Sequence, residues 1–488
     1  MSENLNSPHF KVQNFINGKF SSAVSTQTLN FFNPAKNQIL GTCPDSQAED
    51  VQNACLAAEQ AFQPWSQLDQ RARSEFLFKI AELLEKNAER FAIAESQNTG
   101  KTVKHCIEVE IPRSALNLRF FAELSNQWAS EFYQTSPALS HHVLRQALGV
   151  VTCISPWNLP LYLFTWKIAP ALALGNCVIA KPSEVTPLTA SLFAELCLEA
   201  KLPAGVLNIL HGTGANLGAT LCSHPKIKAI SFTGSTHSGR NIAITAAPYF
   251  KKLSLEMGGK NSSIVFASSD LEKAANGVLR SAFLNQGQIC LCGSRILIEE
   301  SVYEPFKKLL LEKIKIWKVG RPESSETLLG SLVSENHFNK VSRLISQAIE
   351  QGAKVLCGAQ SVKLATPYDK GFFYAPTLLE GLTNENFFNQ EEVFGPVATL
   401  QKFSSESEAI ALSNQSPYGL SSSVWTQDLN QANRVAQKLE VGMLWINTWM
   451  ARDLRTPFGG VKNSGLGREG GIEALRFFSE AKTVSIQY

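Results

Sequence analysis

The chain has 488 residues, more than one compact core usually holds, so two or three domains are expected. Hydrophobic residues make up 44% and charged residues 18% of the chain, as in an ordinary globular protein, and 45 basic against 42 acidic residues give a net charge of +3. This balance, with no run of lysine and arginine, excludes an electrostatic surface for nucleic acid.

The ten cysteines form no C-x-x-C pair and do not indicate a disulfide framework in a chain of this length, so we expect a reducing, cytoplasmic location. The eight histidines contain no pair spaced as metal ligands, and no metal site is expected. The N-terminal residues lack the pattern of a signal peptide. The most apolar stretch, residues 168–180, is interrupted by proline, glycine and asparagine and is too short to span a membrane.

Residues 50–98 are predicted to be helical. The spacing of the apolar side chains predicts one buried face, which the pattern assigns to Phe76, Ile80, Leu83 and Leu84. The pattern ends at Asn98-Thr99-Gly100.

From about residue 148, short apolar runs alternate with helical segments. We predict strands at 149–154, 177–180, 206–210 and 227–232, and helices at 161–174 and 187–200. The third strand is followed by a glycine-bearing segment, 212–218, which contains Gly214 and Gly218. This alternation is typical of a parallel sheet with helices on both faces.

A second strand–helix series follows and predicts another α/β domain. Its strands are expected at 262–266 and 294–298, and its helices at 271–283, 303–317 and 336–351. Cys290 lies in the loop before the strand at 294–298. The last residues, 483–488, alternate as an edge strand that requires a pairing partner, for which another subunit is one candidate.

Polar residues follow three strands of the first series, at the edge where parallel sheets bind ligands. These are Asn158, the segment 181–184, and Gly234-Ser235. Gly234 and Gly239 flank a strand-to-helix turn that would direct helix N–H groups at a pyrophosphate, although the spacing is not G-x-G-x-x-G. Glu184 with Lys181 predicts recognition of a ribose and favours NAD over NADP, with Lys181 leaving some ambiguity.

Cys290 is the candidate nucleophile, because glycine and polar residues surround it and allow a ligand to approach closely. A nucleophilic cysteine must be a thiolate, so the site has to lower its pKa. A helix N-terminus or a positively charged nicotinamide ring would do so. Cys292 would share a face with Cys290 in a strand-like stretch, as a bystander or an oxidation trap.

Glu256 and Asn158 are the candidates for the remaining catalytic roles. Glu256 ends a predicted strand beside Gly258 and Gly259, and would deprotonate a water for attack on a thioester. Asn158 lies in a turn between two prolines, and its amide, with the Cys290 N–H, would stabilise an oxyanion. Losing one such donor typically lowers the rate by about 10²–10³.

Together these motifs resemble those of the aldehyde dehydrogenase superfamily, from about residue 12 to the C-terminus. The matching segments are 156–158, 181–184, 232–235, 255–260, 285–290, 391–396 and 457–460. The resemblance implies an α/β fold with a Rossmann-type NAD-binding domain (9–124 and 147–256) and an α/β catalytic domain (257–473). A small β oligomerisation arm (125–146 and 474–488) would join a homodimer or homotetramer.

The resemblance also implies the site residues. Cys290 would be the nucleophile, Glu256 the base and Asn158 the oxyanion donor, while Glu392 would bind the nicotinamide ribose and Phe394 would lie beside the ring. The full set of predicted cofactor-binding residues is Ile154, Ser155, Trp157, Lys181, Ser183, Glu184, Gly214, Gly218, Phe232, Thr233, Gly234, Ser235, Glu392 and Phe394.

Within the superfamily, the chain is similar to the 2-aminomuconic and 2-hydroxymuconic semialdehyde dehydrogenases. The similar segments are 111–113, 154–163, 165–170, 290–292 and 452–454. This implies that Arg113 and Arg452 hold the carboxylate of the substrate, with Trp166 and Trp449 as pocket walls; an arginine offers a bidentate fork for this purpose. Arg455 departs from the subgroup and would either add a third positive charge at the pocket mouth or point to solvent.

The predicted reaction is the NAD-dependent oxidation of an aldehyde to a carboxylic acid through a cysteine thioester, with a dicarboxylate semialdehyde as the substrate. Three alternatives stay open at this point. They are the same chemistry on a betaine, aliphatic or succinic semialdehyde, a CoA-acylating relative, against which Glu256 argues, and a non-catalytic structural or binding protein on this fold.

Overall fold

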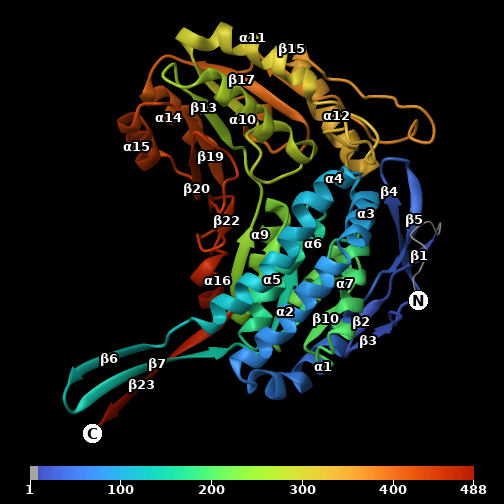
Figure 1. The fold of residues 1–488 in the computed structure, drawn as a ribbon, viewed down its shortest axis with the longest axis vertical. Coiled ribbons are helices and arrows are strands. Elements are labelled where there is room, and N and C mark those ends of the chain that lie inside the picture. Colours follow the sequence, from blue (N-terminus) through green and yellow to red (C-terminus); the bar gives the residue numbers. More distant parts are fainter. Residues whose placement is uncertain (1–8) are drawn as a thin grey trace.

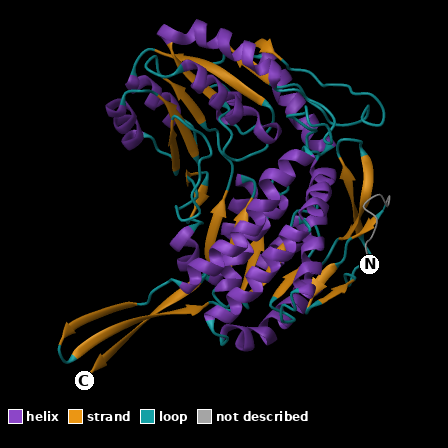
Figure 2. Cartoon of the chain, in the orientation of Figure 1, coloured by secondary structure: helices purple, strands orange, loops and turns teal. Residues whose placement is uncertain are grey.

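Two open sheets, each covered by helices, organise the chain in the computed structural model, which describes residues 9–488 (Figure 1). The part of the N-terminal segment before residue 9, where no signal peptide is predicted, lies outside the described residues. Figure 2 shows that helices cover both sheets and that a separate β arm extends away from them.

The helices predicted over residues 50–98 are confirmed as α1 (Ala48–Ser66), α2 (Gln70–Lys86) and α3 (Ala88–Thr99). Ile80, Leu83 and Leu84 of α2 are buried as their spacing predicts. Helix α3 ends at Gly100, whose φ of 79° is accessible to glycine at little cost. A short helix α4 (Val103–His105), a π-helical turn (Cys106–Glu110) and α5 (Ile111–Asn126) follow.

The first sheet has the strand order β22-β12-β11-β8-β9-β10-β2-β3. Its parallel strands confirm the predicted alternation and are β8 (Val150–Ile154), β9 (Cys177–Lys181), β10 (Leu207–Ile209), β11 (Ile227–Thr233) and β12 (Lys252–Glu256). The antiparallel edges are β2 (Asn14–Ile16), β3 (Lys19–Ser21) and β22 (Gly465–Leu466). Between the strands lie α6 (Pro160–Ala173), α7 (Leu188–Glu199), α8 (Gly214–Ser223) and α9 (Thr236–Ala246).

The second sheet has the order β15-β16-β17-β14-β13-β19-β20. Its strands are β13 (Ser262–Val265), β14 (Arg295–Glu299), β15 (Lys354–Cys357), β16 (Thr377–Glu380), β17 (Val397–Phe403), β19 (Ser421–Trp425) and β20 (Met443–Ile446). Its helices are α10 (Leu271–Phe283), α11 (Tyr303–Lys313), α12 (Glu335–Glu350), α13 (Phe387–Gln390), α14 (Glu406–Asn414) and α15 (Leu429–Lys438). The helix predicted at 303–317 is shorter than expected, because residues 314–316 tighten into a 3₁₀ turn.

The arm consists of β6 (Glu131–Ser136), β7 (Leu139–Ala147) and β23 (Ser479–Gln487), and carries the C-terminus away from both sheets (Figure 1). The predicted terminal strand is confirmed, and it is longer than expected. It pairs with β7 of its own chain, from Ser479 opposite Ala147 to Gln487 opposite Leu139. Because the order is β23-β7-β6, the outer edges of β23 and β6 have no partner strand among the described residues.

The remaining elements are small. β1 (Phe10–Lys11), β4 (Thr28–Asn33) and β5 (Gln38–Pro44) form a three-stranded sheet, and β18 (Tyr418–Gly419) pairs with β21 (Val461–Lys462). Helix α16 (Gly471–Phe477) packs against α5 and α6, so the chain returns to the first sheet before it enters the arm. Within residues 9–488, no helix is both long and apolar enough to cross a membrane.

Candidate active site

Cys290 lies in a strongly bent loop between α10 and β14. Asn285 and Gln286 have φ values of 55° and 57°, and Gly287 follows with 69°, so the chain adopts the left-handed region at consecutive positions. Such backbone strain tends to cluster at functional sites. A Cβ atom at Gly287 would overlap the carbonyl of Gly395, so the close approach of these two segments requires glycine. The loop leaves Cys290 partly exposed in a cavity of about 230 Å³.

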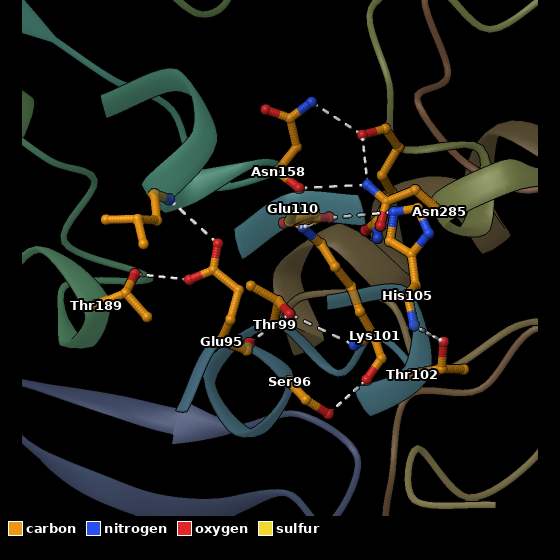
Figure 3. Close-up of polar contacts among 12 residues, drawn as sticks. Glu95, Ser96, Thr99, Lys101, Thr102, His105, Glu110, Asn158, Thr189 and Asn285 are labelled. Carbon is orange, nitrogen blue, oxygen red and sulfur yellow. Dashed lines mark hydrogen bonds and ion pairs between the residues drawn. The ribbon is translucent and has the colours of Figure 1, made fainter. Parts of the chain in front are cut away.

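Asn158 reaches the same cavity from the turn after β8. Its amide donates to the carbonyl of Gln288 at 2.9 Å, and Asn285 in turn donates to the carbonyls of Asn158 at 3.2 Å and Gln288 at 3.1 Å (Figure 3). These bonds tie the Asn158 turn to the Cys290 loop, although their residues are more than 100 positions apart in the sequence. The amide is therefore held next to the nucleophile.

Asn261 was not expected from the sequence. Its amide donates to the carbonyls of Cys290 at 2.7 Å and Cys292 at 3.0 Å, and so holds the backbone on both sides of Leu291. The sequence feature that could have identified Asn261 is its position directly after the Gly258-Gly259-Lys260 turn that follows Glu256.

Cys292 is a buried thiol whose pKa is raised to about 12 by burial. Residues 289–292 form a turn, closed by a bond from the N–H of Cys292 to the carbonyl of Ile289, so the strand-like geometry considered for this stretch is not found. Burial also raises the pKa of Cys290 well above its ordinary value, and Glu256 and Glu392 add to the effect. A positive charge that entered the site would oppose this shift and favour the thiolate.

Glu256 is the last residue of β12, and its neighbours Met257 and Gly258 line the cavity. Within the described part of the chain, neither carboxylate oxygen of Glu256 has a hydrogen-bond partner. Burial, followed by the nearby carboxylate of Glu469, raises the pKa of Glu256 to about 8. A carboxyl poised near neutral pH suits a general base.

Glu469 belongs to a buried polar cluster behind Glu256. It pairs with Lys167 at 2.6 Å, accepts from the indole of Trp166 at 2.9 Å, and accepts from Ser231 at 3.1 Å. Neither Lys167 nor Glu469 is among the residues predicted from the sequence to form the site. No sequence motif marks either residue, because Lys167 lies in an otherwise apolar helix and Glu469 lies among glycines.

Six of the predicted cofactor-binding residues line the cavity that holds Cys290 and Asn158. They are Trp157, Thr233, Gly234, Ser235, Glu392 and Phe394, and they are joined by the unforeseen Pro156, Met257, Gly258, His337 and Lys340. Glu392 accepts from the N–H of Gly259 at 2.9 Å. The rings of Trp157 and Phe394 meet edge to face at 5.3 Å.

The other predicted cofactor residues lie outside this cavity, mostly at the carboxyl ends of the parallel strands. Ile154 ends β8, Lys181 ends β9 and Phe232 lies near the end of β11, while Ser155, Ser183 and Glu184 follow the first two strands. Lys181 pairs with Glu184 at 3.2 Å. Gly214 and Gly218 lie on α8, and a Cβ at either would meet no atom within 4 Å.

These residues fit a dinucleotide. The buried hydroxyls of Ser155 and Thr233 have no hydrogen-bond partner among residues 9–488. Ser235 caps α9 by accepting from the N–H of Ser238 at 3.1 Å, so a helix N-terminus opens beside the cavity. Unsatisfied donors and a helix N-terminus favour a phosphate-bearing ligand.

A second cavity, of about 240 Å³, adjoins the Asn158 and Cys290 segments. Leu159 and Ile289, the direct neighbours of Asn158 and Cys290, line it. Its polar lining consists of His105, Glu110, Arg113, Tyr162, Arg280 and Arg452, and its remaining apolar lining of Val109, Leu284 and Met450. The two predicted substrate arginines, from segments more than 300 residues apart, therefore share one cavity.

The two guanidinium groups share one aromatic platform. Arg113 lies 5.6 Å and Arg452 5.5 Å from the ring centroid of Trp166. Arg113 donates through Nε to Asn117 at 3.0 Å, but its buried Nη2 has no partner in the described chain. Arg452 donates to the hydroxyl of Tyr162 at 3.2 Å. Burial lowers the pKa of Arg113, and Arg452 lowers it further. Two adjacent cations with an unused donor favour a carboxylate ligand.

The other residues predicted for the substrate pocket, Trp166, Trp449 and Arg455, do not line the second cavity. Trp166 and Trp449 are buried and are not among its lining residues, and the Trp449 indole donates to the carbonyl of Leu291 at 3.1 Å. Both rings therefore support the site from behind. Arg455 pairs with Asp453 at 2.6 Å, and its side chain is 78% exposed.

Comparison with known proteins identifies the fold. The aldehyde dehydrogenase family model matches residues 20–484. The chain is 45% identical over 480 residues to 2-aminomuconic semialdehyde dehydrogenase of Danio rerio, covering 98% of both chains. It is 39% identical over 483 residues to 2-hydroxymuconic semialdehyde dehydrogenase of Pseudomonas sp. (strain CF600), covering 98% of this chain and 99% of the relative.

Solved structures agree with this result. Indole-3-acetaldehyde dehydrogenase complexed with NAD⁺ superposes with a TM-score of 0.95 at 36% identity, over 98% of this chain and 97% of that one. Betaine aldehyde dehydrogenase from Staphylococcus aureus, also with NAD⁺, gives a TM-score of 0.94 at 34% identity, over 97% and 94% of the two chains. The predicted fold is confirmed.

Proposed function

This chain belongs to the aldehyde dehydrogenase family, and we propose that its substrate is a short unsaturated semialdehyde that carries a carboxylate, such as 2-aminomuconic or 2-hydroxymuconic semialdehyde. The predicted enzyme class, an NAD-dependent aldehyde dehydrogenase, is confirmed by the family match and the NAD⁺-bound relatives. The observation that carries the substrate proposal is the pairing of Arg113 with Arg452 over Trp166, in a cavity that reaches the Cys290 loop.

In the proposed mechanism, the Cys290 thiolate attacks the carbonyl carbon of the aldehyde and forms a hemithioacetal. The Asn158 amide and the Cys290 N–H donate to the oxygen that becomes negative. The residues of the first cavity would hold NAD⁺, which would supply the hydride acceptor for oxidation of the hemithioacetal to a thioester. Glu256 then removes a proton from water, which attacks the thioester and releases the acid.

The residues of the first cavity support this assignment of the cofactor. Glu392 would hold the nicotinamide ribose, and Phe394 would flank the ring, since both line the cavity with Cys290. Glu184 would accept from the adenosine ribose, and the Lys181–Glu184 pair keeps its carboxylate oriented. A positive nicotinamide beside Cys290 would offset the burial that raises the pKa of its thiol.

Other substrates within the family fit the second cavity less well. A betaine aldehyde carries a quaternary ammonium group, which Arg113 and Arg452 would repel. A neutral aliphatic aldehyde would leave the unpaired Nη2 of Arg113 buried without a partner. Glu256 supports hydrolysis of the thioester rather than its transfer to CoA.

A panel of aldehydes tests the proposal. NADH formation would be measured with 2-hydroxymuconic semialdehyde, succinic semialdehyde, betaine aldehyde and a neutral aldehyde of similar length, each with NAD⁺ and with NADP⁺. We expect the highest kcat/KM for the muconic compound with NAD⁺. An equal kcat/KM for the acidic semialdehydes and the neutral aldehyde would contradict the assignment of Arg113 and Arg452 to the substrate carboxylate.

We also propose a homodimer or homotetramer that assembles through the arm, because the outer edges of β23 and β6 have open hydrogen-bonding groups in the described chain. A cytoplasmic location is supported by the cysteines at all ten positions, which are free thiols.

A further inference from the structure

The helix that carries Arg113 begins with an unusual turn. Helix α4 passes into the π-helical turn Cys106–Glu110 before α5 starts. Such turns are rare and occur mostly at functional sites. Residues five apart lie on different sides of an α-helix, which has 3.6 residues per turn, but a wider turn brings them together. Here it places His105 beside Glu110, and both line the cavity of Arg113 and Arg452.

Glu110 is held firmly in this turn. Both of its oxygens accept from the ammonium group of Lys101, at 2.6 and 2.7 Å, and the two side chains are almost fully buried. Its Oε1 atom also lies 3.3 Å from Nε2 of His105 (Figure 3). Although burial opposes ionisation, the pKa of Glu110 lies below its ordinary value because Lys101 and His105 interact with its charge. Glu110 is therefore a carboxylate that accepts from His105.

This contact determines which ring nitrogen of His105 can act as a hydrogen-bond acceptor. When Nε2–H donates to a carboxylate, Nδ1 of the neutral imidazole has no proton and accepts hydrogen bonds. The His105 ring lines the cavity of Arg113 and Arg452. The ring is only partly exposed, with a side-chain exposure of 17%.

The cavity is otherwise rich in donors. Arg113, Arg280 and Arg452 present guanidinium groups, which donate only. The Glu110 carboxylate is engaged by Lys101 and His105, and the Tyr162 hydroxyl already accepts from Arg452. Beside these donors, the His105 imidazole supplies an acceptor at Nδ1 when its Nε2–H donates to Glu110.

We propose that His105 is a specificity residue that recognises a hydrogen-bond donor next to the substrate carboxylate. With the carboxylate on Arg113 and Arg452, the amino or hydroxyl group on the adjacent carbon of a muconic semialdehyde would donate to Nδ1. The inference rests on the proposed function, and it adds a reason why a substituted semialdehyde is preferred over an unsubstituted one. A site that hydrogen-bonds a substrate group rejects the analogue without that group.

Two substitutions separate the two ring nitrogens. His105→Gln places its amide near Nε2 and keeps the contact with Glu110, but removes the acceptor at Nδ1. His105→Asn keeps a polar atom near Nδ1 and loses the contact with Glu110. The kinetic constants kcat and KM would be measured with 2-hydroxymuconic semialdehyde and with muconic semialdehyde that lacks the hydroxyl. Thermal unfolding and NAD⁺ binding would show that each variant is folded.

His105→Gln should lower kcat/KM for the hydroxylated substrate by roughly tenfold and leave the unsubstituted one within about twofold, as expected for one lost hydrogen bond. His105→Asn should retain most of the preference. An equal loss on both substrates, or a greater loss in His105→Asn than in His105→Gln, would show that His105 only supports Glu110 and would overturn the assignment. A wild-type enzyme that oxidises a neutral aldehyde but neither muconic compound would overturn the proposed function as well.

Discussion

Glu256 is buried and Cys290 is partly buried, and burial favours the neutral form of each group. The pKa of the thiol is raised well above its ordinary value, and that of the carboxyl is raised to about 8. The two groups act at different stages, since the thiolate is needed for attack on the aldehyde and the carboxylate for hydrolysis of the thioester. This separation removes the need for both charges to be present in the same small volume.

The pKa of Glu256 predicts the pH dependence of thioester hydrolysis. Its folded pKa lies above the ordinary value, so the base form is scarce at pH 6 and increases as the pH rises through about 8. The deacylation rate, measured by rapid mixing, should follow this rise. In Glu256→Gln the rate should fall by about 10²–10⁴ and the rise should disappear, with a burst of NADH as the thioester accumulates. An unchanged pH profile in this variant would remove Glu256 from the role of base.

Arg452 and Arg455 form a matched pair for testing the carboxylate site. Arg452 lies in the second cavity, whereas Arg455 pairs with Asp453 at the surface. Arg452→Ala should raise KM for an acidic semialdehyde by roughly 10–100-fold, since a charge-assisted hydrogen bond is lost. It should change KM for a neutral aldehyde far less, and Arg455→Ala should affect neither. Equal effects of Arg452→Ala on both substrates would count against the proposed substrate class.

At the scale of elements, the turns after the strands bring the chemistry together. Asn158 follows β8, Glu256 ends β12, and Cys290 precedes β14 of the other sheet. The loop with Cys290 reaches the first sheet because its backbone turns back on itself at Asn285, Gln286 and Gly287. The nucleophile is therefore positioned by the conformation of a loop rather than by a regular element.

Two glycines, Gly287 in the Cys290 loop and Gly352 after α12, allow close approach to be distinguished from backbone strain. Gly287 has φ 69° and lies against Gly395, whereas Gly352, after α12, has φ 98° and open space around its Cα. Gly287→Ala should destabilise the fold by more than about 1–3 kcal/mol, because strain and overlap act together, and should reduce activity. Gly352→Ala should show the strain alone, with normal activity. Thermal unfolding and kcat measure both, and equal losses in the two variants would exclude a special role for the Gly395 contact.

At the scale of the whole molecule, the three-stranded sheet of the arm has two edges that are not paired within a single chain, as far as the described residues show. The outer edges of β23 and β6 have no partner strand in the described chain, and most residues of both strands are exposed. Native proteins rarely leave long edges open, because open edges invite pairing with other chains. We therefore expect the arm to be completed by a second copy of this chain.

Removing residues 479–488 tests this expectation. The shortened chain keeps both sheets but loses β23, so the assembly should dissociate to smaller species, while the full-length protein should be a dimer or tetramer. Sedimentation equilibrium would measure both masses. A full-length monomer, or a truncated chain with the mass of the intact assembly, would contradict assembly through the arm.

The α/β alternation, most element positions and the enzyme class were predictable from the sequence. Local patterns decide them: apolar runs of strand length, helical spacing in α2 and α10, and glycine turns after Glu256 and before Cys290. Such signals depend on neighbouring residues only. The motif that identifies Cys290 is likewise contiguous in the chain.

The residues that hold the catalytic and substrate-binding side chains in place could not be predicted from such local patterns. Asn261, Glu469 and Glu110 act through partners that lie from 5 to more than 300 residues away in the sequence, and no local pattern marks them. The π-helical turn before α5 leaves no clear sequence signature either. The role of Trp166 as a platform under two arginines depends on three segments meeting.

The sequence by itself therefore determined the fold class, the enzyme family and which residues are chemically competent, because these depend on residue type and short-range order. Only the tertiary structure decided which of them meet. It brought Arg113 and Arg452 to one aromatic ring, raised the pKa of Glu256 by burial, and placed His105 beside Glu110 in the lining of the second cavity. Distances, burial and the surrounding charges are properties of packed segments, and packing is set by the whole chain.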